Sequence, residues 1–166
     1  EERMKAEFNK RLAEVEMAAL RSQMNPHFLF NCLNSINRFI QRNEPDAASA
    51  YLTKFSRLIR LVLDNSRSNL VTLRDELEAL RLYMELEAMR FVNRFTYHVQ
   101  ISPAIDPTCL EIPPMIIQPY VENAIWHGLM QRKEGGKIAV RIQQPKENLL
   151  RVEIEDNGIG RAAAAE

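Results

Sequence analysis

Hydrophobic residues in the first 70 positions recur at steps of three and four, a spacing that predicts amphipathic helices. The pattern pauses at Pro26, resumes, and pauses again where Asn43, Pro45 and Asp46 favour turn geometry. Long helices on either side of this turn predict an antiparallel hairpin with one wide apolar stripe. Such a hairpin usually buries its stripe by pairing into a four-helix bundle, so we expect a homodimer.

The second half of the chain follows a different pattern. A further helix is expected to begin at Pro113-Pro114 and to run to about Leu129. Apolar and polar residues alternate in three stretches, at residues 95–101, 137–143 and 150–154. Such alternation predicts half-buried strands. The order of these elements predicts an α+β fold, with helices laid on one face of a mixed sheet.

Glycine and proline usage adds a boundary to this picture. The first 90 residues contain no glycine and only two prolines, whereas the rest contain five glycines and six prolines. Thr72 followed by Asp75 resembles a capping pair that opens a helix over residues 73–90. We therefore expect three segments: a helical region at 1–70, a connecting helix at 71–92 and a mixed domain at 93–166.

Charge and composition exclude several classes of protein. Lys+Arg and Asp+Glu both number 22, so zero net charge gives no overall reason to bind nucleic acid. Cys32 and Cys109 cannot form a disulfide framework, which fits a reducing compartment, and we expect both to be structural. Charges interrupt every apolar run before the roughly 18 residues that a membrane helix needs. The chain opens at Glu1 already in a helical pattern, which indicates a segment of a longer protein.

The first candidate site lies around Pro26, where residues 23–31 read QMNPHFLFN. Either Asn25 caps a new helix with Pro26 at its first position, or one long helix kinks there. In a first turn, the positive end of the helix dipole favours a neutral, nucleophilic His27 ring. Asn31 lies one turn further on the same face. The alternative is an ordinary surface histidine near a helix end.

The second candidate site lies in the helix expected after Pro114. Asn123 and His127 share one face of it, and Glu122 and Trp126 share the neighbouring face. An asparagine amide oxygen is a suitable ligand for Mg²⁺. The alternative is a half-exposed helix with a polar outer face.

A third candidate, Asp156-Asn157-Gly158-Ile159-Gly160, directly follows an apolar strand. Two glycines separated by one residue allow a close approach of backbone N–H groups to a phosphate or base. An ordinary hairpin end would look similar. His98 lies on the polar face of an alternating strand, so we expect it to be exposed.

In this order, the three segments resemble the LytS/YehU-type family of sensor histidine kinases. Residues 23–31 are similar to its phosphoacceptor signature. Residues 113–124, PPMIIQPYVENA, are similar to the N box of its ATP-binding domain, and residues 156–160 to the first glycine box. The stretch from Arg81 to Phe91 is similar to the connecting helix of the family. The resemblance implies a GHKL-type (Bergerat) ATP-binding fold in residues 93–166.

The activity implied by the resemblance is autophosphorylation. ATP with Mg²⁺ would bind the C-terminal domain, and His27 would attack the γ-phosphate. The phosphoryl group would then pass to an aspartate of a response regulator. Asn31 would place a water for the reverse, phosphatase reaction. The family also implies the cytoplasmic portion of a bacterial inner-membrane sensor, anchored through segments outside this sequence.

The resemblance also assigns roles within the nucleotide site. Asn123 would hold Mg²⁺, with Glu122 nearby to orient a water of the metal. Asp156 would accept a hydrogen bond from the adenine amino group. Gly158 and Gly160 would let the loop close over the nucleotide.

Three departures from the family pattern affect these expectations. Phe28 follows His27 where the larger superfamily carries an acidic residue, so no base is evident. Trp126 stands where a lysine is common, so that a phosphate-binding cation is either missing or partly replaced by His127. The sequence ends six residues after Gly160, before the lid and second glycine box of such domains. We therefore expect this segment alone to bind ATP weakly or not at all, and not to autophosphorylate.

Other functions compete with the kinase interpretation. A non-catalytic dimeric signalling scaffold with a degenerate ATP-binding domain would account for Phe28 and Trp126. A related ATPase of the gyrase, chaperone or mismatch-repair kind, or a serine kinase opposing a sigma factor, would lack the His27 segment. A helix-turn-helix DNA binder is disfavoured by the long hairpin helices and the neutral charge.

Overall fold

The computed structural model describes residues 3–6, 9–11, 24–91, 95–129 and 135–158. The chain divides into two compact units, Glu1–Asn69 and Leu70–Glu166. The predicted connecting helix is part of the second unit. No helix in the described part of the chain combines the length and the apolar character needed to cross a membrane.

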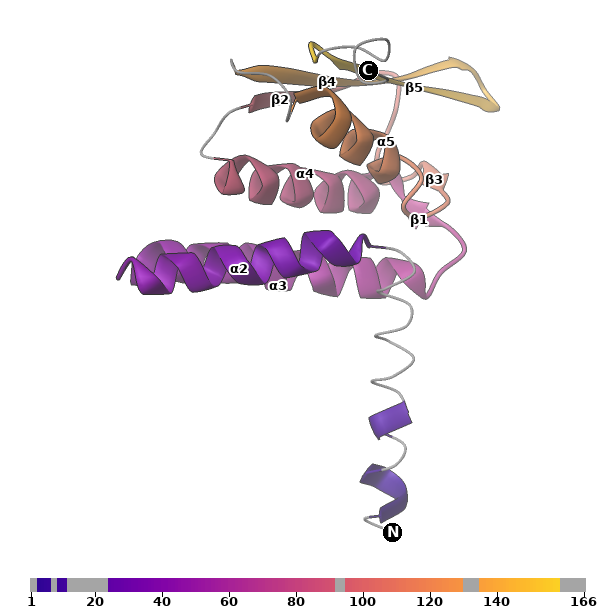
Figure 1. Ribbon diagram of the computed structural model, residues 1–166. Helices are drawn as coiled ribbons and strands as arrows, with labels where there is room; N and C mark the ends of the chain where they lie inside the picture. Colours follow the sequence, from indigo (N-terminus) through magenta and orange to yellow (C-terminus); the bar gives the residue numbers. More distant parts are fainter. Residues whose placement is uncertain (1–2, 7–8, 12–23, 92–94, 130–134, 159–166) are drawn as a thin grey trace. The chain divides into compact units, whose positions relative to one another are not determined.

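The first unit contains a helical hairpin of α2 (Pro26–Gln41) and α3 (Pro45–Ser66), which lie side by side (Figure 1). The turn between them contains Asn43 with φ of 56°, a left-handed conformation that asparagine tolerates better than most residues. The predicted turn is therefore confirmed. The turn could be predicted from the sequence because its own residues favour turn conformations.

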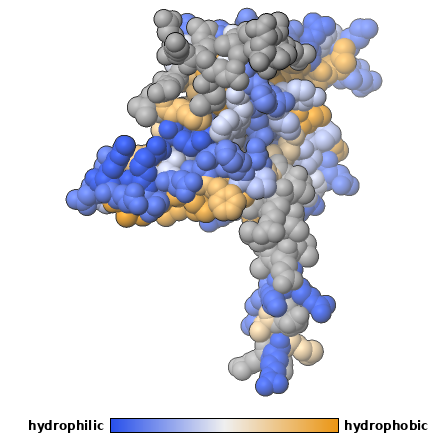
Figure 2. All heavy atoms as spheres, in the orientation of Figure 1, coloured by the Kyte–Doolittle hydropathy of each residue, from blue (hydrophilic) through white to orange (hydrophobic). Residues whose placement is uncertain are grey.

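A buried cluster holds the hairpin together. The Tyr51 hydroxyl donates to Cys32 Sγ at 3.4 Å. The centres of the Phe39 and Tyr51 rings lie 5.9 Å apart. Cys32 is buried, as expected, whereas Cys109 is exposed. Four large apolar side chains of the hairpin stay exposed in the single chain: Phe30, Leu33, Ile40 and Leu52. Figure 2 shows apolar surface along one side of this hairpin.

The second unit is built on a mixed three-stranded sheet. Its strands are β2 (Phe95–Ile101), β4 (Gly136–Lys146) and β5 (Leu149–Asp156), in the order β2-β4-β5. Strand β2 runs parallel to β4, and β5 runs antiparallel to it. All three predicted strands are confirmed, and so is the exposure of His98. The observed class is a mixed helix-and-sheet fold.

Helices cover one face of this sheet. Helix α4 (Leu73–Arg90), helix α5 (Gln118–Asn123) and the π-helix η1 (Ala124–Leu129) lie on the same side of it (Figure 1). Thr72 caps α4, because its Oγ1 accepts a hydrogen bond from the Asp75 N–H at 3.2 Å. The capping pair read from the sequence is therefore confirmed.

The helix predicted to follow Pro113-Pro114 starts later in the structure than the sequence predicts. The helix begins at Gln118 instead of Pro113-Pro114. Met115 has a left-handed φ of 58°, which a right-handed helix cannot include, so residues 114–117 form a turn. Before this turn, the two-residue strand β3 (Glu111–Ile112) pairs with β1 (Val71–Thr72). Neither short strand was predicted, because two residues show no alternation.

Candidate functional site

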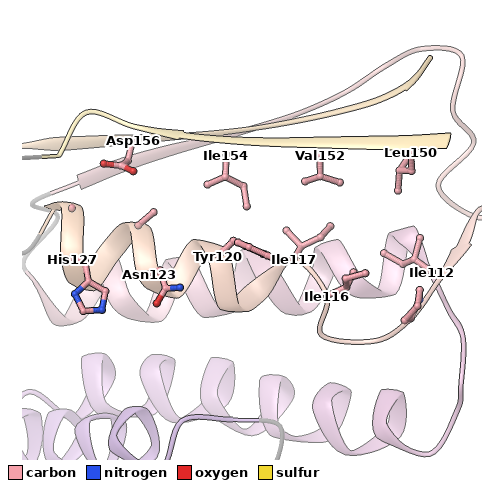
Figure 3. A pocket seen from close by; sticks show the side chains of 13 residues that line it. Ile112, Ile116, Ile117, Tyr120, Asn123, His127, Leu150, Val152, Ile154 and Asp156 are labelled. Carbon is pink, nitrogen blue, oxygen red and sulfur yellow. The ribbon is translucent and has the colours of Figure 1, made fainter. Parts of the chain in front are cut away.

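A cavity of about 1050 Å³ opens between β5 and the α5–η1 helix. The turn before α5 forms a further wall. The lining residues are Ile112, Pro113, Ile116, Ile117, Tyr120, Asn123, Ala124, His127, Gly128, Leu150, Val152, Ile154 and Asp156. Figure 3 shows that Asp156 lies at the same end as Asn123 and His127, whereas Leu150 lies at the end near Ile112 and Ile116. The pocket is therefore polar at one end and apolar at the other.

The polar end unites side chains from separate parts of the chain. Asn123 and His127 are one helical turn apart and both line the pocket, as their spacing predicts. Asp156 reaches it from the end of β5. An amide, an imidazole and a carboxylate next to an apolar wall can hold a ligand that has both a flat apolar part and an anionic part.

The loop after β5 packs closely against η1. A Cβ on Gly158 would lie 2.4 Å from Gly128 Cα, and a Cβ on Gly128 would lie 2.6 Å from Asp156 Oδ1. A side chain at position 158 would therefore meet the backbone of η1, and one at position 128 would displace the Asp156 carboxylate. The Gly158 N–H also donates to Asp156 Oδ1 at 2.8 Å. Sequence reasoning missed Gly128, although a glycine within a predicted helix is a signal of close packing.

The same loop is attached to the sheet through Asn157. Asn157 Oδ1 accepts a hydrogen bond from the Lys137 N–H at 2.7 Å, and the Asn157 N–H donates to the Lys137 carbonyl at 3.2 Å. These bonds fix the backbone directly after Asp156. Gly160, the other glycine of the predicted box, lies outside the described residues.

Trp126 turns away from the pocket and packs against the end of α4. The Arg90 guanidinium carbon lies 4.8 Å from the centre of the Trp126 ring and 4.0 Å from that of Phe91. Arg90 also donates to both carboxylate oxygens of the buried Glu87, at 3.1 and 3.0 Å. Trp126 is not among the residues that line the cavity. Of this neighbouring pair, His127 alone faces the ligand space.

Glu122 also lies outside the lining of the pocket. Its carboxylate accepts a hydrogen bond from Gln118 Nε2 at 3.1 Å. Burial raises the pKa of Glu122; the Gln118 hydrogen bond lowers it, and repulsion from Glu87 raises it further. The structure therefore brings Asn123, His127 and Asp156 together, and places Glu122 with Gln118 instead.

A buried carboxylate that sequence reasoning missed lies under the turn before α5. Glu76 of α4 is 2% exposed. Its oxygens accept hydrogen bonds from the Met115 N–H at 2.9 Å and the Ile117 N–H at 3.3 Å. Burial raises the pKa of Glu76, and these backbone bonds partly offset the rise. Nothing in its local sequence distinguishes it from the other glutamates of α4.

His27 lies at the start of a capped helix in the first unit. Asn25 Oδ1 accepts from the His27 N–H at 3.0 Å, and Pro26 is the first helical residue. Of the two readings of Pro26, the structure therefore has the new helix. The exposed His27 ring has its Nδ1 3.1 Å from Asn31 Nδ2, whereas Phe28 is buried. Asn31 is thus placed to orient the ring.

Comparison with known proteins gives consistent matches. The family model described as "Histidine kinase" matches residues 15–95. Sensor protein LytS of Staphylococcus epidermidis strain RP62A is 37% identical over 151 residues, covering 90% of this chain and 24% of that protein. Sensor histidine kinase/phosphatase LytS of Staphylococcus aureus strain Mu50 is 33% identical over 152 residues, covering 92% of this chain and 26% of that protein.

The chain thus spans about a quarter of the length of the curated relatives it matches. The matched region includes the His27 helix, the hairpin and α4. The chain belongs to the LytS-type family of sensor histidine kinases.

Proposed function

We propose that this chain is the kinase core of a two-component sensor, in which ATP bound in the second unit phosphorylates His27. The observation that carries the proposal is the meeting of Asn123, His127 and Asp156 in one pocket. The same chain presents a histidine at a capped helix start. A phosphoryl transfer needs both parts, a nucleotide site and an acceptor.

The shape and chemistry of the pocket support a nucleotide. The Asp156 carboxylate can accept a hydrogen bond from an adenine amino group, and the apolar wall of Ile154 and Val152 can pack against the base. Gly158 and Gly128 bring the loop backbone close to this position. His127 can donate to phosphate oxygens at the polar end.

The residues also fit a magnesium nucleotide. The described residues contain no group of three His, Cys, Asp or Glu side chains suited to a metal ion. Mg²⁺ does not need such a group, because it commonly takes one or two protein oxygens together with phosphates and waters. The Asn123 amide oxygen would supply the protein ligand, and bound Mg²⁺ would neutralise charge on the phosphates. Glu122 would act only through a water.

The proposed reaction forms a bond from a neutral ring nitrogen of His27 to the γ-phosphorus. The bond from that phosphorus to the β–γ bridging oxygen breaks, ADP leaves, and the ring proton passes to solvent. The Asn31 amide lies next to Nδ1 and would hold the ring in a fixed rotation. With the proton on Nδ1 and the amide oxygen turned toward it, Nε2 keeps the lone pair for the attack. The phosphoryl group is then transferred to an aspartate carboxylate of a response regulator. In the reverse mode, Asn31 would place the water that removes the phosphate.

We also propose that the chain forms a homodimer and belongs to the cytoplasmic part of a membrane sensor. Two hairpins pair into a four-helix bundle through the exposed apolar side chains of α2 and α3. The kinase core lies on the cytoplasmic side of a bacterial membrane sensor. We also expect the 166-residue segment by itself to bind Mg-ATP more weakly than the full-length protein, which isothermal titration of both would measure.

The test uses full-length protein with Mg²⁺ and γ-labelled ATP, and compares wild type with His27→Gln. We expect label that survives base and is lost in acid, in wild type only. Label in both proteins would place the phosphoryl group elsewhere. ATP binding without label in either would favour the dimeric scaffold, for which the buried Phe28 beside His27 is the supporting observation.

A further inference from the structure

The helix that carries the nucleotide-binding residues begins without a cap of its own. The N-cap position of α5 is Ile117, which has no side-chain hydrogen bond to offer. Met115, two residues earlier, has a left-handed φ of 58°. The first N–H groups of a helix lack partners within it, so a helix start of this kind needs an acceptor from elsewhere.

Glu76, from a distant part of the chain, supplies an acceptor for the N–H of the N-cap residue Ile117 and another for the N–H of Met115 in the turn before it. It lies 39 residues before Met115 and 41 before Ile117, and one carboxylate oxygen bonds to each N–H. Among the described residues, no lysine or arginine forms an ion pair with this carboxylate. A buried carboxylate needs compensation by hydrogen bonds or charge, and here the backbone of the turn provides it.

The turn held by Glu76 is itself part of the pocket. Pro113, Ile116 and Ile117 line the cavity, and α5 continues from Gln118 to Asn123. Figure 3 shows Ile116, Ile117 and Asn123 following one another along the wall opposite β5. A shift of the turn would therefore move both this wall and the start of the helix that carries Asn123.

The other end of the same helix is also held by α4. Arg90 lies against the Trp126 ring of η1 while it is bonded to Glu87. Helix α4 thus makes two contacts with this region. Glu76 bonds to the turn that precedes α5, and Arg90 lies against Trp126 in η1. The position of Asn123 along the pocket is set between these two contacts.

We propose that Glu76 is a positioning residue of the nucleotide site, whose carboxylate holds the turn at residues 114–117 so that Asn123 and His127 face the bound nucleotide. The inference rests on the proposed function, because it assumes that the pocket binds a magnesium nucleotide. Glu76 acts through the backbone of Met115 and Ile117 and does not touch the ligand.

The test compares Glu76→Gln with Leu77→Ala in the full-length protein. Glu76→Gln removes one strong acceptor and the charge, whereas Leu77→Ala removes buried packing from the same turn of α4 and leaves the carboxylate in place. Each protein is measured for its unfolding midpoint, its affinity for Mg²⁺ with a non-hydrolysable ATP analogue, and amide hydrogen exchange at Met115 and Ile117.

For Glu76→Gln we expect faster hydrogen exchange at the Met115 and Ile117 amides. We also expect the affinity for the nucleotide analogue to be roughly tenfold weaker, which is typical when a residue that supports a ligand-binding residue is lost. For Leu77→Ala we expect a lower unfolding midpoint with an affinity within about twofold of wild type, since the capping bonds remain. Wild-type affinity in Glu76→Gln, or equal losses in both variants, would overturn the inference.

A further measurement uses the wild-type protein, with and without nucleotide. Bound nucleotide should slow exchange at Met115 and Ile117, and unchanged exchange would refute the positioning role even if Glu76→Gln does not fold. Failure of the wild-type protein to bind the nucleotide would instead remove the proposed function. The two failures are therefore distinguished by the wild-type titration.

Discussion

At the scale of single residues, Glu122 carries a carboxylate whose charged form is disfavoured by the fold. Burial is the main cause of its raised pKa, and the negative charge of Glu87 adds to the effect. The folded state therefore holds the proton of Glu122 more tightly than the unfolded state does. Stability must then fall as pH rises from the ordinary glutamate pKa through the raised value.

We predict that Glu122→Gln is more stable than wild type near neutral pH, with the difference disappearing as pH falls to about 4. The glutamine keeps an oxygen for the Gln118 hydrogen bond and removes the charge. Urea unfolding at a series of pH values measures the difference, with the exposed Glu153→Gln as control. A stability gain that grows toward acidic pH would contradict the assignment.

The sequence identified those polar residues of the pocket that neighbouring positions in the chain are enough to reveal. Asn123 and His127 could be paired from helical spacing, and Asp156 from its position at the end of an apolar strand. Glu76 could not be found, because its partners are backbone N–H groups about forty positions away that only the fold brings near. Gly128 was missed because its requirement comes from Asp156 and Gly158, on another element.

At the scale of elements, α4 depends on its cap. Thr72 Oγ1 satisfies the Asp75 N–H, one of the N–H groups that the helix itself cannot pair. We predict that Thr72→Ala lowers the free energy of unfolding by about 1 kcal/mol, the usual cost of losing such a cap. Thr96→Ala, on the exposed face of β2, is the matched control in chemical denaturation. Equal effects of the two changes would show that the cap contributes nothing.

Periodicity predicted the elements that bury a regular face, namely the hairpin, α4 and the three strands. It placed the start of α5 four to five residues too early, because Met115 breaks the helix through a conformation that the spacing of apolar residues does not encode. It also could not distinguish η1 from an ordinary α-helix. Segments of π-helix often occur at functional sites, and this one carries His127.

At the scale of the whole molecule, the exposed apolar side chains of the hairpin predict self-association. Phe30 and Ile40 are 66% and 62% exposed, although both are large and apolar. We predict that Phe30→Glu combined with Ile40→Lys converts a dimer to a monomer, since charges would be buried in the bundle. Light scattering coupled to size exclusion measures the mass, with the exposed Ser49→Glu as a charge control. A double variant that remains dimeric would place the interface elsewhere.

The packing of Arg90 between Phe91 and Trp126 has an optical consequence. Trp126 is the only tryptophan of the 166-residue sequence, and a guanidinium group lies over its ring. Its neighbour His127 lines the pocket in which the ligand would bind. Indole emission from this segment therefore reports, without any added dye, whether the junction of α4 and η1 loosens or tightens as the pocket fills.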